Sequence, residues 1–554
     1  MNVRSVIPFA VVVVAATAQL DIKFEDDAGF RIYVAGDEWL GSAPIRAFAS
    51  GVPVAPAWCV CLYVCARVCA SACVCSAHCL RLHCHLPLDR WRTLNRTGTV
   101  HSKGSDTIGA FTLVNVSWIS AGAGAGGKDD DLVLHTSLKV YGDGSTAIFI
   151  QQLPMGATGT NASNPVLPQG VREMDPGNYD PVVSFPALSG GKLETLGYLT
   201  WQSRMVNAES GTNVTRGPGG QNEPLIDGMG LQGLSTSGPV VLFDPQFNSL
   251  VIAPMDNFKS VVHHVRGGTG ASATWDTGVS SELTSLPPGF EHRTLLVAGR
   301  GITATLDAFG RTIRMALKTN RRMVQADPNL QYLSYWTDNG AYNSGTAWAP
   351  PWGGAGGGGT EVNEAGLRQT ALGLKDQGLL HAVKSWQLDD WWYMTSKPQG
   401  GVYSACVANW TLPSATFPSG LRDLSKALTV PWLLYVPFWC PENVYKFEFE
   451  WIHSFNPDDP TLIFAEPHPS NSEAFYAMLF DYGIGNGMGG FEHDYLDYNY
   501  LAMPYLRKTH GAATEWLAGI NAAAVERSVP VQICMALPSD LMSSLNFHSM
   551  TNYR

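Results

Sequence analysis

The sequence predicts a multidomain protein in which an N-terminal all-β sandwich precedes a (β/α)₈ TIM-barrel domain that is incomplete in this chain. Three observations support this prediction. The chain has 554 residues, which is too long for one hydrophobic core. Up to about residue 300, short runs of alternating apolar and polar residues lie between turn residues. Beyond about residue 330, apolar strands alternate with amphipathic helices.

The β-rich part extends over residues 19–320. Half-buried antiparallel strands must pack on a second sheet, so many such strands in succession favour a sandwich. Gly-rich polar loops such as 121–131 and 207–221 separate the strands. The alternation predicts strands at Ala110–Trp118, Leu132–Tyr141, Thr146–Gln152, Leu196–Gln202, Val240–Phe243, Ser249–Ala253 and His292–Ala298. This part is expected to support a neighbouring site or to form one of its walls.

The barrel part extends over residues 321–554, after a helix that apolar spacing predicts at Leu306–Lys318. Strands that recur every 40 to 60 residues, roughly, fit successive βα units with long loops. The predicted strands are Tyr332–Thr337, Ser385–Leu388, Trp432–Pro437, Gly490–His493 and Val531–Met535. The predicted helices are Glu361–Gln377, Ser419–Leu428, Ser472–Leu479 and Ala512–Arg527. A sixth strand can begin only at the last residues.

The N-terminus reads as a signal peptide over residues 1–18. Arg4 supplies a positive charge, an apolar run follows, and Ala16-Thr17-Ala18 offers a cleavage site. N-x-[ST] sequons at Asn95, Asn115, Asn161, Asn213 and Asn409 fit such a chain. We therefore expect a secreted or endomembrane-lumen protein without a membrane span. The net charge of -11 argues against nucleic acid as the partner.

Eight of the eleven cysteines lie between Cys59 and Cys84. Their alternation with Val and Ala resembles a translated GT-rich repeat, so the favoured hypothesis is that segment 52–88 is a retained intron or a gene-model error. One alternative is a small disulfide module, as secreted chains often contain. The other is a zinc site formed with His78, His83 and His85.

Polar or aromatic residues follow each predicted strand of the barrel part. In parallel barrels the catalytic and substrate-binding residues lie at the carboxyl ends of the strands. The candidates, in strand order, are Trp336 and Asp338; Asp389, Asp390 and Trp391; Trp439; Glu492 and Asp494; and Cys534. Carboxylates accept hydrogen bonds from hydroxyl groups, and Trp rings offer apolar faces to sugar rings. Together these residues predict a sugar-binding pocket.

The order of these motifs resembles that of the α-galactosidases and raffinose synthases (seed imbibition proteins). The Asp389-Asp390-Trp391 run resembles the D-D-x-W signature after their second strand, and Asp494 falls where they have the strand-four nucleophile. The segment from Cys534-Met535 to Arg554 resembles the C-M-…-R segment of the raffinose-synthase branch. The resemblance covers residues 331–554; over the first 320 residues it is limited to a β-rich composition.

The resemblance implies a retaining glycoside hydrolase or transglycosylase that acts on α-linked sugars, with α-galactosides as the first expectation. Asp494 would be the nucleophile, and Asp389 and Asp390 would accept hydrogen bonds from sugar hydroxyls. Trp391, Trp336 and Trp439 would offer ring faces. Asp338, Glu492 and Cys534 complete the expected substrate-binding set. A carbohydrate is the expected partner, and the mechanism requires no cofactor or metal.

Two features depart from that family. The family usually has a Lys two residues before the nucleophile, whereas this chain has Glu492. Side chains at i and i+2 of a strand share a face, so Glu492 and Asp494 should point inward and His493 towards the helices. The family acid/base lies at the end of strand six, a few residues after an Arg that Arg554 resembles. We therefore expect a C-terminally truncated, inactive and poorly soluble fragment, because an unclosed barrel exposes a strand edge.

Two other classes of function remain open. One is a carbohydrate-binding pseudoenzyme, or an inactive gene-model fragment, that keeps the Trp and Asp residues. The other is a structural secreted β-protein with an unrelated barrel, which would bind no sugar. The barrel fold hosts many chemistries, so the fold alone does not decide between them.

Overall fold

The computed structural model describes most of the chain between residues 19 and 553. The described ranges are 19–25, 29–43, 46–48, 91–92, 94–120, 132–161, 181–189, 195–202, 204–211, 235–266, 274–319, 322–337, 363–389, 392–396, 406–415, 417–455 and 463–553. The expected signal peptide 1–18 and the cysteine-rich segment 52–88 lie outside them. Asp338, Asp390, Trp391 and Arg554 also lie outside the described residues.

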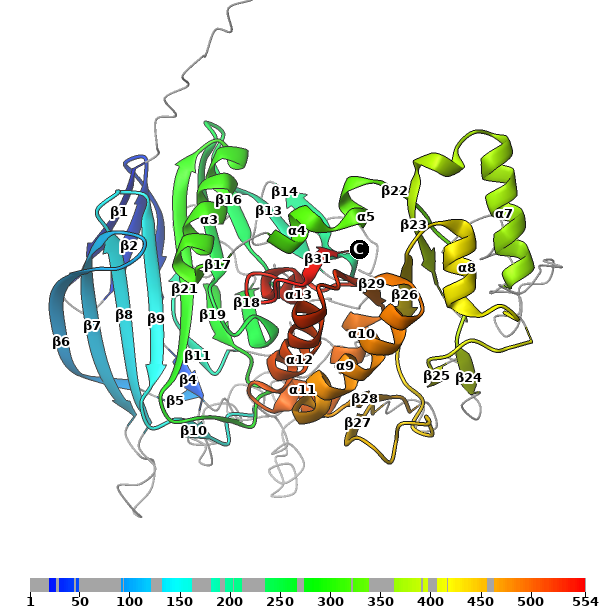
Figure 1. Ribbon diagram of the computed structural model, residues 1–554. Helices are drawn as coiled ribbons and strands as arrows, with labels where there is room; N and C mark the ends of the chain where they lie inside the picture. The colour runs from blue at the N-terminus through cyan, green and yellow to red at the C-terminus, as the bar shows by residue number, and fades with distance from the viewer. Residues whose placement is uncertain are drawn as a thin grey trace, which may run out of the picture.

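Two large antiparallel sheets form the N-terminal half of the described structure (Figure 1). The seven-stranded sheet has the order β1 (Leu20–Phe24), β2 (Phe30–Val34), β3 (Asp37–Ser42), β12 (Ala187–Ser189), β19 (Thr274–Val279), β18 (Val261–Arg266) and β15 (Ser235–Thr236). The nine-stranded sheet has the order β14 (Asn207–Gly211), β13 (Gly197–Gln202), β16 (Val240–Phe243), β17 (Asn248–Pro254), β21 (Phe290–Arg300), β9 (Thr146–Leu153), β8 (Val133–Tyr141), β7 (Ala110–Ser120) and β6 (Leu94–Ser105).

The two sheets share one hydrophobic core. Trp39 and Trp275 enter it from the first sheet, and Leu134 and Phe149 enter it from the second. This arrangement agrees with the predicted sandwich, and each strand predicted in this half is present. Strand β6 was not predicted, because its residues are polar and almost all exposed although its backbone pairs with β7 along its length. Shorter pairings involve β4 (Arg46–Phe48), β5 (Trp91–Arg92), β10 (Ala157–Thr158), β11 (Val183–Ser184) and β20 (Ser285–Leu286).

Helix α3 (Ile302–Leu317) covers the outer side of the nine-stranded sheet. It buries Phe309 and Ile313 against residues of β17 and β21, in a second core. The apolar spacing predicted this helix, although it begins four residues earlier than expected. It ends with Lys318 in the left-handed conformation at φ 56°, which stops the helix and redirects the chain.

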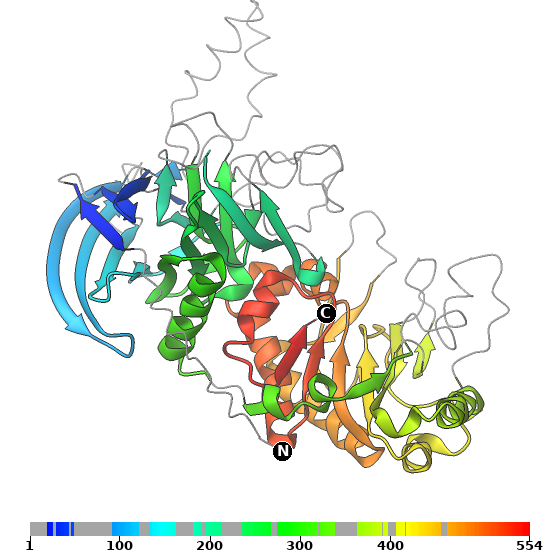
Figure 2. The same cartoon turned by 90° about the horizontal axis from the view of Figure 1, so that it is seen from above.

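A parallel sheet forms the C-terminal half. In the described part of the chain it has six strands, which follow the order of the sequence: β22 (Leu333–Tyr335), β23 (Val383–Leu388), β26 (Trp432–Val436), β29 (Met488–His493), β30 (Val531–Ile533) and β31 (Met550–Tyr553). Each strand pairs in parallel with the next. In Figure 2 the strands follow one another in a curved row. The sheet is a curled partial barrel, and β31 is the sixth strand at the end of the sequence.

Helices connect and cover these strands. The longer ones are α7 (Glu364–Asp376), α8 (Gly420–Leu428), α9 (Pro469–Gly485) and α12 (Ala512–Arg527). Shorter helices are α4 (Arg322–Ala326), α5 (Pro328–Gln331), α10 (Leu496–Leu501), α11 (Pro504–Lys508) and α13 (Pro538–Ser543), and 3₁₀ turns lie at η4 (Arg204–Val206), η5 (Phe258–Ser260) and η7 (Leu380–Ala382). Two hairpins, β24 (Met394–Ser396) with β25 (Cys406–Asn409) and β27 (Trp451–His453) with β28 (Ala465–Pro467), lie in the loops after β23 and β26.

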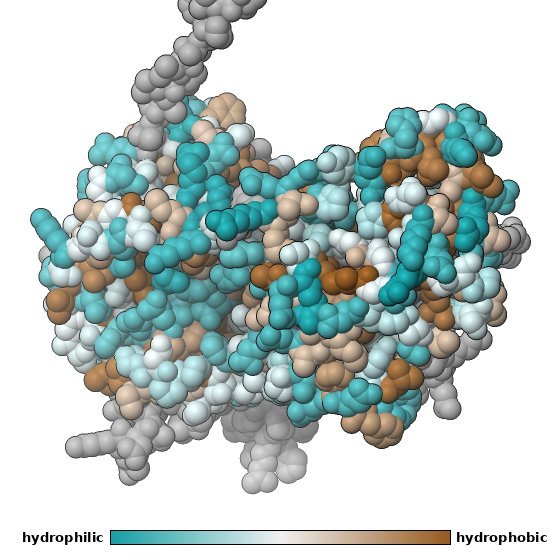
Figure 3. Space-filling view, viewed as in Figure 1, coloured by the Kyte–Doolittle hydropathy of each residue, from teal (hydrophilic) through white to brown (hydrophobic). Residues whose placement is uncertain are grey.

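The first strand of the parallel sheet lies at a partly apolar edge. Tyr332 and Leu333 are 55% and 68% exposed, and two leucines of the segment that leads to the second strand, Leu372 and Leu379, are 58% and 54% exposed. The face shown in Figure 3 is mostly hydrophilic, and apolar residues gather over α7 and α8. An exposed parallel edge of this kind can pair with a further strand.

Two buried ion pairs join the halves of the molecule. Lys259 of η5 contacts Asp540 of α13 at 2.6 Å, and Arg507 of α11 pairs with Glu282. A backbone hydrogen bond from Thr284 N to Lys508 O, at 3.1 Å, lies beside the second pair. No helix in the described part of the chain is long and apolar enough to span a membrane.

Candidate active site

Asp494 directly follows β29, the fourth strand of the parallel sheet. Its backbone N–H donates to Val436 O at 2.9 Å, which extends the parallel pairing by one residue. Two neighbouring groups among the described residues donate to its carboxylate: Tyr435 OH to Oδ2 at 2.7 Å, and Tyr495 N–H to Oδ1 at 2.6 Å. Asp494 is 7% exposed. The carboxylate is therefore held in one orientation from two sides.

The turn after Asp494 has an unfavourable backbone conformation. Tyr495 has φ 53° and ψ 30°, the left-handed region in which a non-glycine residue costs roughly 1–2 kcal/mol. Met535, after the neighbouring strand β30, is also left-handed, at φ 51°. Hydrogen bonds from Leu496 N to Cys534 O and from Asp497 N to Met535 O tie the two turns together, at 3.4 and 3.2 Å. Such strain persists where the surroundings over-determine the backbone, and it gathers at functional sites.

Glu492 and Asp389 meet at one amide group. The Gln387 Nε2 group donates to Glu492 Oε2 at 2.5 Å and to Asp389 Oδ2 at 2.6 Å. Asp389 N also donates to Thr337 Oγ1 at 2.9 Å, which connects the ends of the first and second strands. Glu492 and Gln387 are fully buried. The structure thus brings Asp389, directly after β23, and Glu492 of β29 to the same amide group, although β26 lies between these two strands in the sheet.

His493 lies on the opposite face of β29, as the alternation of side chains predicted. Its Nε2 atom lies 2.9 Å from Tyr476 OH of α9, and its ring packs edge-on against Trp516 of α12. Burial lowers the pKa of His493 to about 4. Glu466 of β28 lies 3.9 Å from the same nitrogen and is also fully buried. Burial raises the pKa of Glu466 well above its ordinary value.

Of the tryptophans expected to contact a sugar, Trp336 and Trp439 are among the described residues, and their side chains have different surroundings. Trp336, at the end of β22, is partly exposed. Trp439 is fully buried, and its ring packs against Phe475, Tyr445 and Trp451 at centroid distances of 4.9, 5.6 and 6.1 Å. The ring of Trp439 is therefore enclosed by other aromatic side chains in this structure, and its expected contact with a sugar stays a prediction.

Cys534 is buried directly after β30, where its N–H donates to His493 O at 2.9 Å. It thus lies beside the strand that carries Asp494. Asp338, Asp390 and Trp391, the remaining expected site residues, lie outside the described residues. In the part of the chain that the structure describes, no group of three or more His, Cys, Asp and Glu side chains is placed to hold a metal ion.

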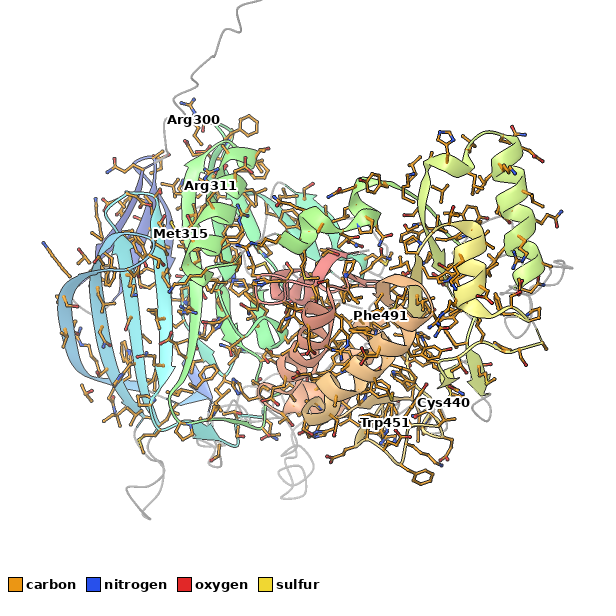
Figure 4. All side chains as sticks on the ribbon, viewed as in Figure 1. Arg300, Arg311, Met315, Cys440, Trp451 and Phe491 are labelled. Atoms are coloured by element: carbon orange, nitrogen blue, oxygen red, sulfur yellow. A yellow bond between two sulfur atoms is a disulfide. The ribbon has the colours of Figure 1, made fainter. Side chains whose placement is uncertain are left out.

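A disulfide fixes the loops after the second and third strands. Cys406 of β25 is bonded to Cys440, which lies four residues beyond the end of β26. Cys440 N–H donates to Val407 O at 2.9 Å, and Val407 N–H donates to Phe438 O at 3.0 Å. Figure 4 labels Cys440 and Trp451 in this region of the molecule.

Sequence reasoning missed several residues of this site. Tyr435 and Gln387 orient the carboxylates, and Glu466 lies behind the strand that carries Asp494. For Tyr435 the available signal was a hydroxyl group inside the otherwise apolar strand WLLYV. The strand of Gln387, VKSWQL, contains other polar residues and gave no such signal. The sequence offered no comparable signal for Glu466 or for the pairing of Cys406 with Cys440.

The structure is similar to those of known glycoside hydrolases. An α-N-acetylgalactosaminidase from Bifidobacterium bifidum, NagBb, matches over 94% of this chain and 75% of its own in a complex with Gal-NHAc-DNJ, with 11% identity and a TM-score of 0.50. A quadruple mutant of the same protein matches over 94% and 76%, with 9% identity and a TM-score of 0.51. An α-galactosidase from Lactobacillus brevis matches over 83% of this chain, with 10% identity and a TM-score of 0.47.

This chain spans only 60% of the Lactobacillus brevis α-galactosidase. No family model matches the sequence, and no curated protein matches it. The structural similarity shows the fold alone: two antiparallel sheets followed by a curled parallel sheet form an architecture that this chain shares with the Bifidobacterium bifidum enzyme. It agrees with the family that the sequence motifs resemble.

Proposed function

We propose that this protein is a retaining glycosidase or transglycosylase for α-linked sugars, with α-galactosides as the first substrate class and Asp494 as the nucleophile. One observation carries the proposal. The Asp494 carboxylate follows the fourth parallel strand, is almost fully buried, and is oriented by Tyr435 OH and Tyr495 N–H. Catalytic residues of parallel barrels lie at such strand ends.

The two hydrogen bonds suit the chemistry of a nucleophile. Donors directed at a carboxylate favour its ionised form, which is the form that attacks an anomeric carbon. They also restrict its orientation, so less ordering is needed on the way to the transition state. A second carboxyl group must protonate the departing oxygen of an ordinary glycoside. A glycosyl fluoride needs little such assistance, so it allows the nucleophile to be tested by itself.

The sugar ring would lie against the inner face of the parallel sheet. Asp389 and Glu492, which share the Gln387 amide, are proposed to accept hydrogen bonds from its hydroxyls. Trp336 is proposed as a wall. Asp338, Asp390, Trp391 and Cys534 stay in the proposed substrate-binding set on the strength of the sequence motifs alone. The proposed division of the chain is a sandwich domain at 19–320 and a catalytic domain at 321–554.

The test is covalent trapping of the nucleophile. The full chain is incubated with a 5-fluoro-α-galactosyl fluoride, digested, and analysed by mass spectrometry. The proposal expects one added glycosyl group on the peptide that contains Asp494. It expects no label in Asp494→Asn and normal labelling in Asp481→Asn, because Asp481 lies on the surface with its side chain 63% exposed. A label on another residue would overturn the assignment of Asp494.

Two further outcomes distinguish the other classes of function. If the chain binds galactosides in calorimetry but is neither labelled nor able to release fluoride, it is a carbohydrate-binding pseudoenzyme. If it neither binds nor reacts, the function is outside sugar chemistry and the proposal fails as a whole.

We also propose that the protein matures in an oxidising compartment, secreted or in the endomembrane lumen. The Cys406–Cys440 disulfide supports this, since such bonds are rare in the cytosol. The sequon residues Asn95 and Asn161 are exposed and open to glycan addition. Comparing the mass before and after glycosidase digestion of protein from a secreting host tests the assignment; an unglycosylated intracellular product would contradict it.

A further inference from the structure

Three buried polar side chains lie behind the strand that carries Asp494. Glu466 comes from β28, Tyr476 from α9 and His493 from β29, and each is fully buried. The Tyr476 hydroxyl lies 2.9 Å from His493 Nε2 and 3.3 Å from Glu466 Oε2. On the other side of the ring, His493 Nδ1 lies 3.2 Å from the backbone carbonyl oxygen of Asp494. The three side chains thus form a continuous chain of contacts that ends at Asp494.

The direction of each hydrogen bond in this chain follows from the chemistry of its groups. A carbonyl oxygen only accepts, so His493 Nδ1 must carry the hydrogen that bonds to Asp494 O. Burial lowers the pKa of His493 to about 4, so the ring is neutral and its Nε2 atom has no hydrogen. Tyr476 therefore donates its hydroxyl hydrogen to Nε2. The tautomer of His493 is fixed from both sides.

The hydrogen between Glu466 and Tyr476 must then come from Glu466. Tyr476 has only one hydroxyl hydrogen, and His493 already accepts it. Burial raises the pKa of Glu466 well above its ordinary value, which favours the neutral carboxyl group that can donate to the phenol oxygen. The other oxygen, Oε1, is buried without a hydrogen-bond partner among the described groups. That is tolerable for the carbonyl oxygen of a neutral acid and very costly for a carboxylate.

The series of hydrogen bonds from Glu466 to His493 is connected to the carboxylate of Asp494 through a single peptide plane. The carbonyl group of Asp494 and the N–H group of Tyr495 belong to the same planar peptide unit. His493 holds the carbonyl end, and the N–H end donates to Asp494 Oδ1 at 2.6 Å. Rotating this plane would break both hydrogen bonds together. The plane also sets φ of Tyr495, the strained residue of the turn.

We infer that Glu466, Tyr476 and His493 are positioning residues that hold the Asp494–Tyr495 peptide plane, and through it the Asp494 carboxylate, in its working orientation. The catalytic part of this inference rests on the proposed role of Asp494. Aromatic packing supports the same orientation, because the His493 ring lies edge-on between Phe491 and Trp516 at 6.1 and 5.6 Å. Phe491 is labelled in Figure 4, in the interior between the parallel sheet and its helices.

The first part of the test needs no substrate. Nitrogen NMR of the full chain with ¹⁵N-labelled histidine, assigned with His493→Gln, reports which ring nitrogen of His493 carries the hydrogen. Hydrogen exchange followed by mass spectrometry reports protection of the Tyr495 N–H group. We expect the Nδ1–H tautomer in the wild type. In Tyr476→Phe we expect faster exchange in the peptide that contains Tyr495 and unchanged exchange elsewhere in α9 and β29.

The second part of the test measures catalysis with α-galactosyl fluoride. Tyr476→Phe should lower kcat by roughly 10- to 100-fold, the usual cost of losing a partner that orients an active group, with little change in KM. Glu466→Leu should show the same loss. Glu466→Gln should keep most of the activity, because its amide N–H can donate to the Tyr476 oxygen. Tyr482→Phe is the matched control on the same helix, since its ring is partly exposed and makes none of these bonds.

The outcomes separate the two proposals. The proposed positioning role of Glu466, Tyr476 and His493 is overturned if wild-type His493 is the Nε2–H tautomer. It is also overturned if hydrogen exchange of the Tyr495 N–H group is unchanged in Tyr476→Phe, whatever the activity is. Equal losses in Glu466→Gln and Glu466→Leu overturn the proposed direction of the hydrogen bonds. If the wild type neither turns over the fluoride nor is labelled at Asp494, the proposed function fails, while tautomer and exchange still decide the chain of hydrogen bonds.

Discussion

Replacing Lys259 by methionine should strongly destabilise the contact between the two halves of the molecule. The ammonium group of Lys259 lies 2.6 Å from Asp540 Oδ1, 3.2 Å from Ser539 Oγ and 4.1 Å from the centre of the Tyr500 ring. The side chains of Lys259 and Asp540 are only 2% and 1% exposed. Methionine fills the space of the lysine stem and removes only the charged group.

The expected cost follows from what is left behind. In Lys259→Met the Asp540 carboxylate stays buried without its cation, and breaking a buried pair in this way costs roughly 3–5 kcal/mol. The second oxygen of Asp540 still accepts from Leu537 N at 2.9 Å, which leaves the start of α13 in place but does not neutralise the charge. In Lys259→Met/Asp540→Asn the unpaired charge is absent, so the two changes should cost about 1–3 kcal/mol less than their sum.

Urea unfolding followed by tryptophan fluorescence measures these costs. The first transition is used, because a multidomain chain need not unfold in one step. Lys426→Met is the matched control: Lys426 and Asp423 lie 3.8 Å apart with side chains 72% and 67% exposed, and removing an exposed pair changes stability by only about 0.5 kcal/mol. The reasoning would be refuted if Lys259→Met cost no more than Lys426→Met, or if the single and double variants were additive.

Three further changes have expected outcomes. Gly519→Ala should destabilise the protein by about 1–3 kcal/mol, because the new Cβ would lie 2.6 Å from the backbone of α9. Gly373→Ala should instead stabilise it by about 0.5–1 kcal/mol, because no atom lies within 4 Å of the new Cβ; thermal unfolding compares the two variants. Burial, and then the charge of a neighbouring histidine, lowers the pKa of His263 to about 3. Between pH 3 and 6.5 the unfolded chain therefore binds a proton at His263 that the folded chain does not bind. Stability should therefore fall as the pH falls below 6.5, by about 1.4 kcal/mol per pH unit for this group, and urea titrations of His263→Gln at pH 4.5 to 6.5 should lack that slope. Reducing the Cys406–Cys440 bond should cost about 2–4 kcal/mol, and the Cys440→Ser variant should show the same loss but no response to reductant; an equal response in both would refute the bond.

The sequence by itself determined the succession of elements and the position of the predicted nucleophile. Strand β26 reads WLLYV, an apolar run typical of a parallel strand buried on both faces, and it has that burial in the structure. Helix α12 has the predicted bounds, Ala512–Arg527. The parallel strands follow the order of the sequence, so the carboxyl ends of the strands that precede Asp389 and Asp494 necessarily lie at the same edge of the sheet. These features depend on local periodicity and on the regular geometry of βα units.

Only the tertiary structure decided which side chains contact Asp494 and which rings are open to a ligand. Trp439 follows its strand just as a ligand-facing residue would, yet the rings of Phe475, Tyr445 and Trp451 enclose it. Glu466 lies 27 residues before His493 in the sequence and reaches it because β28 and β29 both pack against α9. Burial and hydrogen bonding depend on segments that are distant in sequence and brought together by packing. Local periodicity carries no information about such partners, so the sequence could predict the strand ends but not the groups that hold Asp494 there.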